Sequence, residues 1–495
     1  MTVLGSPRLR AARAQAPGVR TGAGLASSIH HVVGEAAGAG AAAGLVAGSV
    51  AIESFDAVAL YSAAVEAGLE AALWLRPSEH FALVGIGRAW SVEAAGPERF
   101  RDADAAWRSL VGNARLSRPV EVRGLGPVLL GGLGFTGRAP GSQGEWAPFG
   151  AASLVVPSLV ALRSDRLSWL TGSVVADGGS ASADVDELER IWAQLADRAS
   201  ELAPRAGEPV PKPPDAPLAI DGEWPAAEHW RHVVGLMAGA VGRGRLDKVV
   251  FARRVDMSSP APLDVPSALR RLAASAPEST VFAFRRGTST FMGATPERLV
   301  RAAGRTYRTA AIAGSIRRGS DPAEDSALAA ELLASEKERE EHAVVVRAIR
   351  RQLAPISERI EIAPKPGILV LRHVQHLVTE VAGTLRVQEG LLALAGLLHP
   401  TPAVGGEPRD LALAMIDEHE GFDRGWYAGP VGWLSADGDG ELMVALRCGL
   451  VDGSRVTLFA GCGIVADSDP DREWEESRIK MRAIAAALGR AGDEP

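Results

Sequence analysis

The chain has 495 residues, 47% of them hydrophobic and 23% charged, and its mean hydropathy is close to zero. This composition is typical of a folded globular protein and excludes fibrous, disordered and channel-forming classes. Sixty acidic residues outnumber 53 basic ones, and no basic block is interleaved with aromatic residues, so we expect no nucleic-acid partner. The chain has no run of about 20 strongly apolar residues, so we expect no membrane partner either.

Cysteine and lysine are both rare. The two cysteines, Cys448 and Cys462, are too few for a disulfide scaffold or a thiolate zinc site and favour a reducing, cytoplasmic location. Only five of the 53 basic residues are lysines. An ammonium group can lose its proton at working pH when it is buried, whereas a guanidinium cannot. Each remaining lysine is therefore a candidate for a role that arginine could not fill.

The N-terminal half is expected to be rich in strands. Residues 1–50 are rich in Ala, Gly and Arg, and we expect them to form a poorly ordered leader. Between residues 51 and 203, short apolar runs alternate with turn residues, which is typical of several strands with a few helices between them. The predicted strands lie at residues 71–75, 81–84, 128–130 and 153–162.

A proline-rich segment divides the chain. Five prolines between Pro209 and Pro217 predict a stiff linker over residues 204–218, followed by a second region at residues 219–490. In that region a helix is predicted around residues 230–241, where apolar residues recur at helical spacing. Further helices are predicted at residues 321–352 and 472–488, and strands at residues 248–253, 280–284, 288–292, 367–372, 440–450 and 455–461. Because helices and strands do not alternate regularly, the pattern favours an α+β fold.

Two pairs of glutamates could hold a hard cation. Glu338 and Glu341 lie three residues apart in one predicted helix, and Glu473 and Glu476 have the same spacing in another. Each pair therefore projects from one helix face. Four carboxylates with no cysteine alongside favour Mg²⁺ over zinc. The alternative for either pair is a solvated helix face whose charges are paired internally.

Two further residues have the character of a general base and a general acid. Lys248 begins an apolar run, where burial would disfavour the charged amine and give a base near neutral pH. It could instead lie at a strand end with its amine in water. Glu297 follows a proline and precedes apolar residues. It could be a protonated general acid, or a glutamate in the first turn of a helix.

The last third of the chain has backbone that a ligand could approach closely. Gly461 and Gly463 lack a Cβ, so their amides could receive a carboxylate, although a tight turn before a helix would use the same residues. Arg447 is predicted to stand in an apolar strand, where its guanidinium needs a partner that accepts two hydrogen bonds. Either a bound carboxylate or a structural aspartate would satisfy it.

Eight ordered motifs in the chain carry a family resemblance. They are KVVFAR (248–253), FMGATPERL (291–299), AIAGS (311–315), KEREEH (337–342), VQHLVT (374–379), HPTPAVGG (399–406), YAGPVG (427–432), and GCGIV (461–465) with EWEESRIK (473–480). In this order they resemble the chorismate-utilising enzymes, and within that family the chain is similar to isochorismate synthases. The resemblance is dense over residues 226–488 and weaker over the N-terminal half.

The resemblance implies a fold and a reaction. The fold is α+β, with two antiparallel sheets packed face to face and helices outside them, and residues 219–490 form its catalytic part. The implied reaction isomerises chorismate to isochorismate. Lys248 activates water to attack C2, and Glu297 protonates the hydroxyl that leaves C4. The implied cofactor is Mg²⁺, held directly by Glu341 and Glu476, while Glu338 and Glu473 hold its waters.

The resemblance also assigns the substrate contacts. It implies that the Gly461–Cys462–Gly463 amides receive the ring carboxylate and that Tyr427 and Arg447 receive the enolpyruvyl carboxylate. Other residues implied to line the pocket are Lys480, His376, Thr379 and Ser315. Ala403 stands where relatives that use ammonia or release pyruvate carry threonine, which favours water as the nucleophile. Ser315, Ser477 and His373 depart from the residues that are usual at their positions.

Several alternatives stay open. The chain could be a salicylate synthase, in which pyruvate elimination follows isochorismate formation, or a silent module that binds chorismate without turnover. The presence of Lys248, Glu297 and the four carboxylates disfavours the silent module. The resemblance implies a cytoplasmic monomer or weak dimer without an amidotransferase subunit, acting in menaquinone or siderophore biosynthesis. No long heptad run suggests a coiled-coil oligomer.

Overall fold

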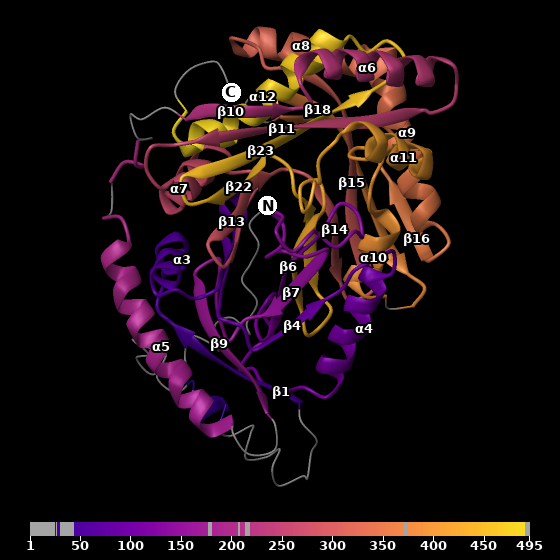
Figure 1. Ribbon diagram of the computed structural model, residues 1–495. Helices are drawn as coiled ribbons and strands as arrows, with labels where there is room; N and C mark the ends of the chain where they lie inside the picture. The colour runs from indigo at the N-terminus through magenta and orange to yellow at the C-terminus, as the bar shows by residue number, and fades with distance from the viewer. Residues whose placement is uncertain are drawn as a thin grey trace.

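Two large β-sheets pack against each other, with helices on their outer faces (Figure 1). The computed structural model describes residues 25, 27–29, 44–176, 181–205, 208–212, 218–370, 374–387 and 389–490. The first sheet has thirteen strands, in the order β10 (Ala219–Trp224), β11 (Lys248–Ser258), β23 (Arg455–Ile464), β22 (Cys448–Asp452), β13 (Ser289–Thr295), β12 (Thr280–Arg286), β2 (Ala71–Arg76), β3 (Phe81–Ile86), β8 (Leu159–Ser164), β9 (Leu167–Ala176), β1 (Gly44–Ile52) and β5 (Arg115–Ser117), with β19 (Gly406–Glu407) beside β11.

The second sheet has ten strands among the described residues. Their order is β16 (Ser357–Ile362), β18 (Val374–Leu385), β15 (Thr306–Arg317), β14 (Arg298–Ala303), β21 (Gly440–Val444), β20 (Pro430–Ser435), β6 (Val128–Leu133), β7 (Ala152–Val156) and β4 (Trp90–Glu93), with β17 (Gly367–Val370) beside β18. Neighbouring strands are antiparallel, as expected, except that β1 and β5 are parallel at the edge of the first sheet. The resemblance-based prediction of an α+β fold with two packed sheets is confirmed.

Helices cover the outer face of each sheet. Those on the first sheet are α3 (Ala57–Glu66), α5 (Ala181–Leu202), α6 (Ala227–Gly242), α7 (Val265–Ser275) and α12 (Pro470–Leu488), and Figure 1 shows α3 and α5 side by side. Those on the second sheet are α4 (Arg99–Gly112), α8 (Pro322–Ala334), α9 (Glu336–Leu353) and α10 (Leu391–Leu398), and α11 (Arg409–His419) lies against β11 and β19. The short helix η1 (Pro77–Glu79) joins β2 to β3. Within the described ranges, no helix is both long and apolar enough to cross a bilayer.

Aromatic side chains fill the space between the sheets. Phe81 of the first sheet stacks on Trp433 of the second, with ring centroids 5.6 Å apart. Deeper in the same core, Trp426 packs edge-on against Phe284 and Phe291 of the first sheet. Large buried rings remove the most apolar surface from water, so this layer is the main force that holds the two sheets face to face.

Both halves of the chain contribute to both sheets. In the first sheet β12 pairs with β2, and in the second β20 pairs with β6, so segments far apart in the sequence are neighbours in space. The halves on either side of the predicted linker are therefore parts of one unit. Residues 44–50, predicted as part of the leader, instead form most of β1, whereas most of residues 1–43 and residues 213–217 of the linker lie outside the described residues.

Three predicted elements are divided in the structure. The predicted strand at residues 153–162 is two strands, β7 and β8, and the predicted helix at residues 321–352 is two helices, α8 and α9. Ser335 separates the helices and caps α9, because its hydroxyl accepts a hydrogen bond from the backbone N–H of Glu338. The predicted strand at residues 440–450 is also two strands, so the placement of Arg447 in a strand is wrong. Arg447 lies between β21 and β22 with a φ of 50°.

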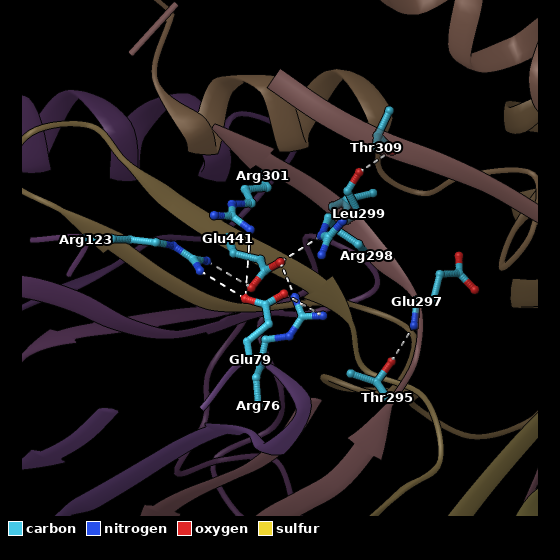
Figure 2. A network of polar contacts seen from close by, with 10 residues as sticks. All are labelled: Arg76, Glu79, Arg123, Thr295, Glu297, Arg298, Leu299, Arg301, Thr309 and Glu441. Carbon is cyan, nitrogen blue, oxygen red and sulfur yellow. Dashed lines mark hydrogen bonds and ion pairs between the residues drawn. The ribbon is translucent and has the colours of Figure 1, made fainter. Parts of the chain in front are cut away.

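A buried carboxylate joins the two sheets (Figure 2). Glu441 of β21 is fully buried and accepts hydrogen bonds from Arg76 of β2 and Arg298 of β14, each at 2.7 Å, and from Arg123 at 3.3 Å. Burial alone would raise the pKa of Glu441, but the three arginines outweigh it and lower that pKa. Glu441 therefore stays ionised and ties β2 to β14 and β21.

Replacement of this carboxylate tests its contribution to stability. Glu441→Ala should lower the free energy of unfolding by about 3–5 kcal/mol, because three arginines lose their buried partner. Urea unfolding followed by circular dichroism measures the change. Glu358→Ala is the control, because Glu358 and its partner Arg305 are both exposed, and its effect should stay within about 0.5 kcal/mol. A loss below about 1 kcal/mol for Glu441→Ala would contradict the assigned role.

Candidate active site

A polar cavity of about 180 Å³ lies where β11 and β23 of the first sheet approach β15 and β18 of the second. Fourteen of the sixteen predicted site residues line it: Lys248, Glu297, Ser315, Glu338, Glu341, His376, Ala403, Tyr427, Arg447, Gly461, Gly463, Glu473, Glu476 and Lys480. The structure therefore brings together acidic and basic residues that lie far apart in the sequence, from Lys248 to Lys480.

Lys248 enters the cavity from the first residue of β11. Side chains alternate along a strand, so Lys248 and Val250 face the cavity while Phe251 packs against Trp230 of α6 on the other face. Lys248 is 3% exposed, and its Nζ donates a hydrogen bond to Oε1 of Glu341 at 2.6 Å. The alternative of a strand-end lysine with its amine in water is therefore wrong.

Glu297 lies where the chain crosses from one sheet to the other. It belongs to the connection between β13 and β14 and not to a helix, so the first-turn alternative is wrong. Its backbone is held on both sides, because its N–H donates to Thr295 Oγ1 at 3.3 Å and its carbonyl accepts from the N–H of Val444 at 2.9 Å. The next residue, Arg298, is fixed by the buried carboxylate of Glu441 (Figure 2).

The environment of Glu297 favours its protonated form. The side chain is buried, and burial raises its pKa to about 7 even though the nearby charges of Lys248 and Lys480 act to lower it. A carboxyl group with this pKa can give up a proton near neutral pH. The geometry therefore suits a general acid.

Helices α9 and α12 supply the four predicted ligand carboxylates. Glu338 accepts a hydrogen bond from the backbone N–H of Ser315 at 2.9 Å, Glu341 pairs with Lys248, and Glu476 pairs with Lys480 at 2.6 Å. Both pairs of glutamates line the cavity, so the alternative of solvated helix faces is wrong.

The four carboxylates are close enough to repel one another. Burial and the charge of Glu476 raise the pKa of Glu473 to about 7, and burial and the charge of Glu341 raise the pKa of Glu338. A divalent cation would relieve this repulsion, and carboxylate oxygens are the ligands that hard cations prefer. The donor set therefore fits such a cation.

Lys480 and Arg447 form a cationic side of the cavity. Besides its pair with Glu476, Lys480 donates through Nζ to the carbonyl of Gly461 at 2.9 Å. Burial opposes the charge of Lys480, but Glu476 outweighs it and raises the pKa of the amine. Nη1 of Arg447 donates to the carbonyl of Lys480 at 3.2 Å and not to a structural aspartate. Lys480 is therefore held by a carboxylate and a carbonyl, whereas Arg447 is hydrogen-bonded to a carbonyl alone among the described residues.

His376 and Ser315 are cross-strand partners in β18 and β15. His376 Nδ1 lies 2.8 Å from Ser315 Oγ and 3.3 Å from the carbonyl oxygen of Gly314. Since a carbonyl only accepts, this geometry favours the tautomer with the proton on Nδ1. Burial lowers the pKa of His376 to about 3, so the ring is neutral at working pH.

Two predicted substrate contacts point away from the cavity. Cys462 lies between Gly461 and Gly463 on the opposite face of β23, where its Sγ donates to the carbonyl of Glu473 at 3.1 Å. Its thiol also lies within 4.8 Å of the Glu473 and Glu476 carboxylates, but burial raises the thiol pKa, so it is a poor metal ligand. Thr379 instead lies 2.7 Å from Nε2 of His342 and so supports α9 beside Glu341. The side chains of Cys462 and Thr379 are therefore placed behind the site.

The remaining walls include residues that the sequence did not single out. Ala403 and Val404 form one side, and Tyr427 stacks on Phe459 with ring centroids 5.2 Å apart. Lys337 lies at the cavity and pairs with Asp467 at 3.6 Å. The scarcity of lysine was the signal that could have marked Lys337, whereas Val404 and Phe459 are apolar and carry no such signal.

Comparisons with known proteins agree with this architecture. A family model described as "Chorismate binding enzyme" matches residues 33–489. The salicylate biosynthesis isochorismate synthase of Pseudomonas aeruginosa is 37% identical over 449 residues, which cover 90% of each chain. The isochorismate synthase MenF of Bacillus subtilis is 33% identical over 422 residues, covering 84% of this chain and 87% of that protein.

Solved structures show the same fold. The menaquinone-specific isochorismate synthase MenF of Escherichia coli matches with a TM-score of 0.74 and 25% identity, over 92% of this chain and 100% of that one. Anthranilate synthase component I of Streptococcus pneumoniae matches with a TM-score of 0.66 and 22% identity, over 82% and 92% of the two chains. Anthranilate synthase component I thus shares the two-sheet fold, and the similarity to isochorismate synthases places this chain in a class of enzymes built on that fold. More particularly, the chain belongs to the chorismate binding enzyme family.

A single methyl group tests the position of Lys248. A Cβ on Gly463 would lie 2.4 Å from Cε and 2.8 Å from Nζ of Lys248, so Gly463→Ala should displace this flexible side chain from Glu341. We expect turnover of chorismate to fall about 10- to 100-fold, because small displacements of reacting groups have effects of this size.

The matched control is Gly235→Ala. Gly235 lies in α6 with open space around its Cα, so this variant should keep its turnover and gain up to about 1 kcal/mol of stability. Steady-state kinetics and thermal unfolding of both variants separate the two effects. Normal turnover by the Gly463→Ala variant would show that the position of Lys248 in the structure is not the one used in catalysis.

Proposed function

We propose that this protein is an isochorismate synthase, which converts chorismate to isochorismate. The observation that carries the proposal is the convergence of Lys248, Glu297 and the glutamates of α9 and α12 on one cavity. The names of similar proteins support the same reaction. Those names also include menaquinone-specific and 2,3-dihydroxybenzoate-specific isochorismate synthases, so the product would supply menaquinone or a catechol siderophore.

In the proposed reaction, Lys248 is the general base and Glu297 is the general acid. Lys248 accepts a proton from a water molecule as the water oxygen bonds to C2 of the ring. The ring double bonds shift, the C4–O bond breaks, and Glu297 protonates the departing hydroxyl, which leaves as water. One water enters and one leaves, so the product is an isomer of the substrate and the reaction needs no redox partner.

The carboxylate set is proposed to hold Mg²⁺. Glu341 and Glu476 would bind the ion directly, and Glu338 and Glu473 would hold its waters. Bound Mg²⁺ would neutralise the ring carboxylate of the substrate. The backbone at Gly461 and Gly463 would receive the same carboxylate, while Tyr427 and Arg447 would receive the enolpyruvyl carboxylate. Each of these residues lines the cavity.

The first test is an assay of the purified protein with chorismate and Mg²⁺, with and without EDTA. We expect HPLC to resolve isochorismate without pyruvate, and we expect EDTA to abolish its formation because, without the cation, the carboxylates of α9 and α12 would repel the dianionic substrate. Excess Mg²⁺ added back to the EDTA-treated sample should restore isochorismate formation, which controls for irreversible loss of the folded enzyme. Salicylate with pyruvate would identify a salicylate synthase instead, and chorismate binding without product would identify a silent module.

The pH dependence tests the role of Glu297. Its pKa is raised to about 7, so the protonated form required of a general acid is lost as the pH rises through that value. We expect the pH profile of kcat/KM to change slope near pH 7 and this change to be absent in Glu297→Gln, and we expect that variant to lower kcat by about 100-fold or more at pH 6.5. Buffers of matched ionic strength control for screening. A rate independent of pH from 6 to 9, or a fully active Gln variant, would rule out this role.

A further inference from the structure

A buried ion pair lies directly behind the cavity without lining it. Glu420 caps the C-terminus of α11, and Arg424 lies four residues further along the chain. Nε of Arg424 donates to Oε2 of Glu420 at 2.7 Å, and Nη2 donates to Oε1. The two side chains are only 3% and 2% exposed, and Arg424 also lies over the ring of Phe135, with its Cζ 4.2 Å from the ring centroid.

This pair occupies a gap in the hydrogen-bond ladder of β11. On this edge of β11, β19 pairs with Lys248 and Val249, and β10 pairs from Arg254 onward, so within the described residues no strand pairs with residues 250–253 on this side. The backbone N–H of Ala252 donates instead to Oε1 of Glu420 at 2.7 Å, and the carbonyl of Val250 accepts from Nη2 of Arg424 at 2.9 Å. The ion pair takes the place of a neighbouring strand just beyond Lys248.

The same arginine holds two further walls of the cavity. Its Nη1 donates to the carbonyl of Val404 at 2.9 Å, and Val404 and Ala403 line the cavity. The carbonyl of Arg424 accepts from the N–H of Tyr427 at 2.9 Å, and Tyr427 lines the cavity as well. The guanidinium itself thus contacts the backbone of β11 at Val250, the backbone of Val404, and the ring of Tyr427, whose centroid lies 5.8 Å from its Cζ.

We propose that Glu420 and Arg424 are positioning residues, which fix the distance between the Lys248 amine and the wall formed by Ala403, Val404 and Tyr427. The proposal rests on the proposed function of Lys248 as base. Stability alone does not explain the pair, because apolar residues of similar volume often replace a buried ion pair without loss. Only a planar guanidinium can donate in several fixed directions at once, here to Glu420, Val250 and Val404.

The test compares Arg424→Lys with a control at an ion pair remote from the cavity. Lysine keeps the positive charge but cannot donate hydrogen bonds in the several fixed directions of the planar guanidinium. We therefore expect kcat for isochorismate formation to fall about 10- to 100-fold, while the Kd for chorismate changes less than threefold. The control is Arg270→Lys. Arg270 makes a bidentate pair with Asp56 at 2.9 and 3.0 Å that joins α7 to the N-terminus of α3, and neither residue lines the cavity. Its turnover should match that of the unmodified protein.

A second variant covers the case in which Arg424→Lys does not fold. Glu420→Gln keeps an oxygen that can accept from Ala252 N–H, and we expect at least a fivefold loss of kcat with chorismate affinity retained. Calorimetric binding stoichiometry gives the folded fraction of each variant. A kcat per binding site equal to that of the unmodified protein overturns the positioning role. Failure of the unmodified protein to form isochorismate overturns the proposed function itself, so the two failures are distinguishable.

Discussion

The pairing of lysines with glutamates inside the fold is the constraint on which this site depends. Lys248 and Lys480 extend into the cavity from β11 and α12, and each meets a glutamate there. An unpaired buried charge costs several kcal/mol. The Lys248–Glu341 pair therefore fixes α9 relative to the first sheet, and the hydrogen bond from Lys480 to the carbonyl of Gly461 in β23 fixes α12. The two lysines thus each offset the charge of one of the four clustered glutamates.

The same constraint acts at the boundary between the sheets. The chain passes from the first sheet to the second at Glu297 and from the second to the first at Arg447, so both residues lie at crossings. A hydrogen bond from the N–H of Val444 to the carbonyl of Glu297 joins the two crossings, and Glu441 holds the arginine next to Glu297. Backbone hydrogen bonds and ion pairs thus hold side chains from both sheets around one cavity.

The set of residues at the cavity could be predicted from the sequence more fully than the directions in which their side chains point. The eight ordered motifs identified most of the residues that line the cavity, because each motif is a short run of neighbouring residues that can be recognised without knowledge of the fold. The direction of the Cys462 side chain follows from strand alternation, since Gly461 and Gly463 face the cavity and the residue between them therefore faces away. The predicted contact of Cys462 is made by its backbone amide and stays a prediction. The break at Arg447 and the contacts of Arg424 could not be predicted, because they depend on which segments the fold brings together.

The sharing of strands between the halves has a consequence for synthesis of the protein. All groups proposed to act on substrate lie after residue 247, yet their sheets are completed by β2 and β6 from the first third of the chain. During translation, β2 and β6 therefore emerge before their partners β12 and β20, and the edges that pair with those partners stay unpaired until the later strands are synthesised. Folding dominated by such distant pairings is slow and exposes aggregation-prone edges, so the yield of native protein should depend on chaperones that shield the nascent N-terminal half.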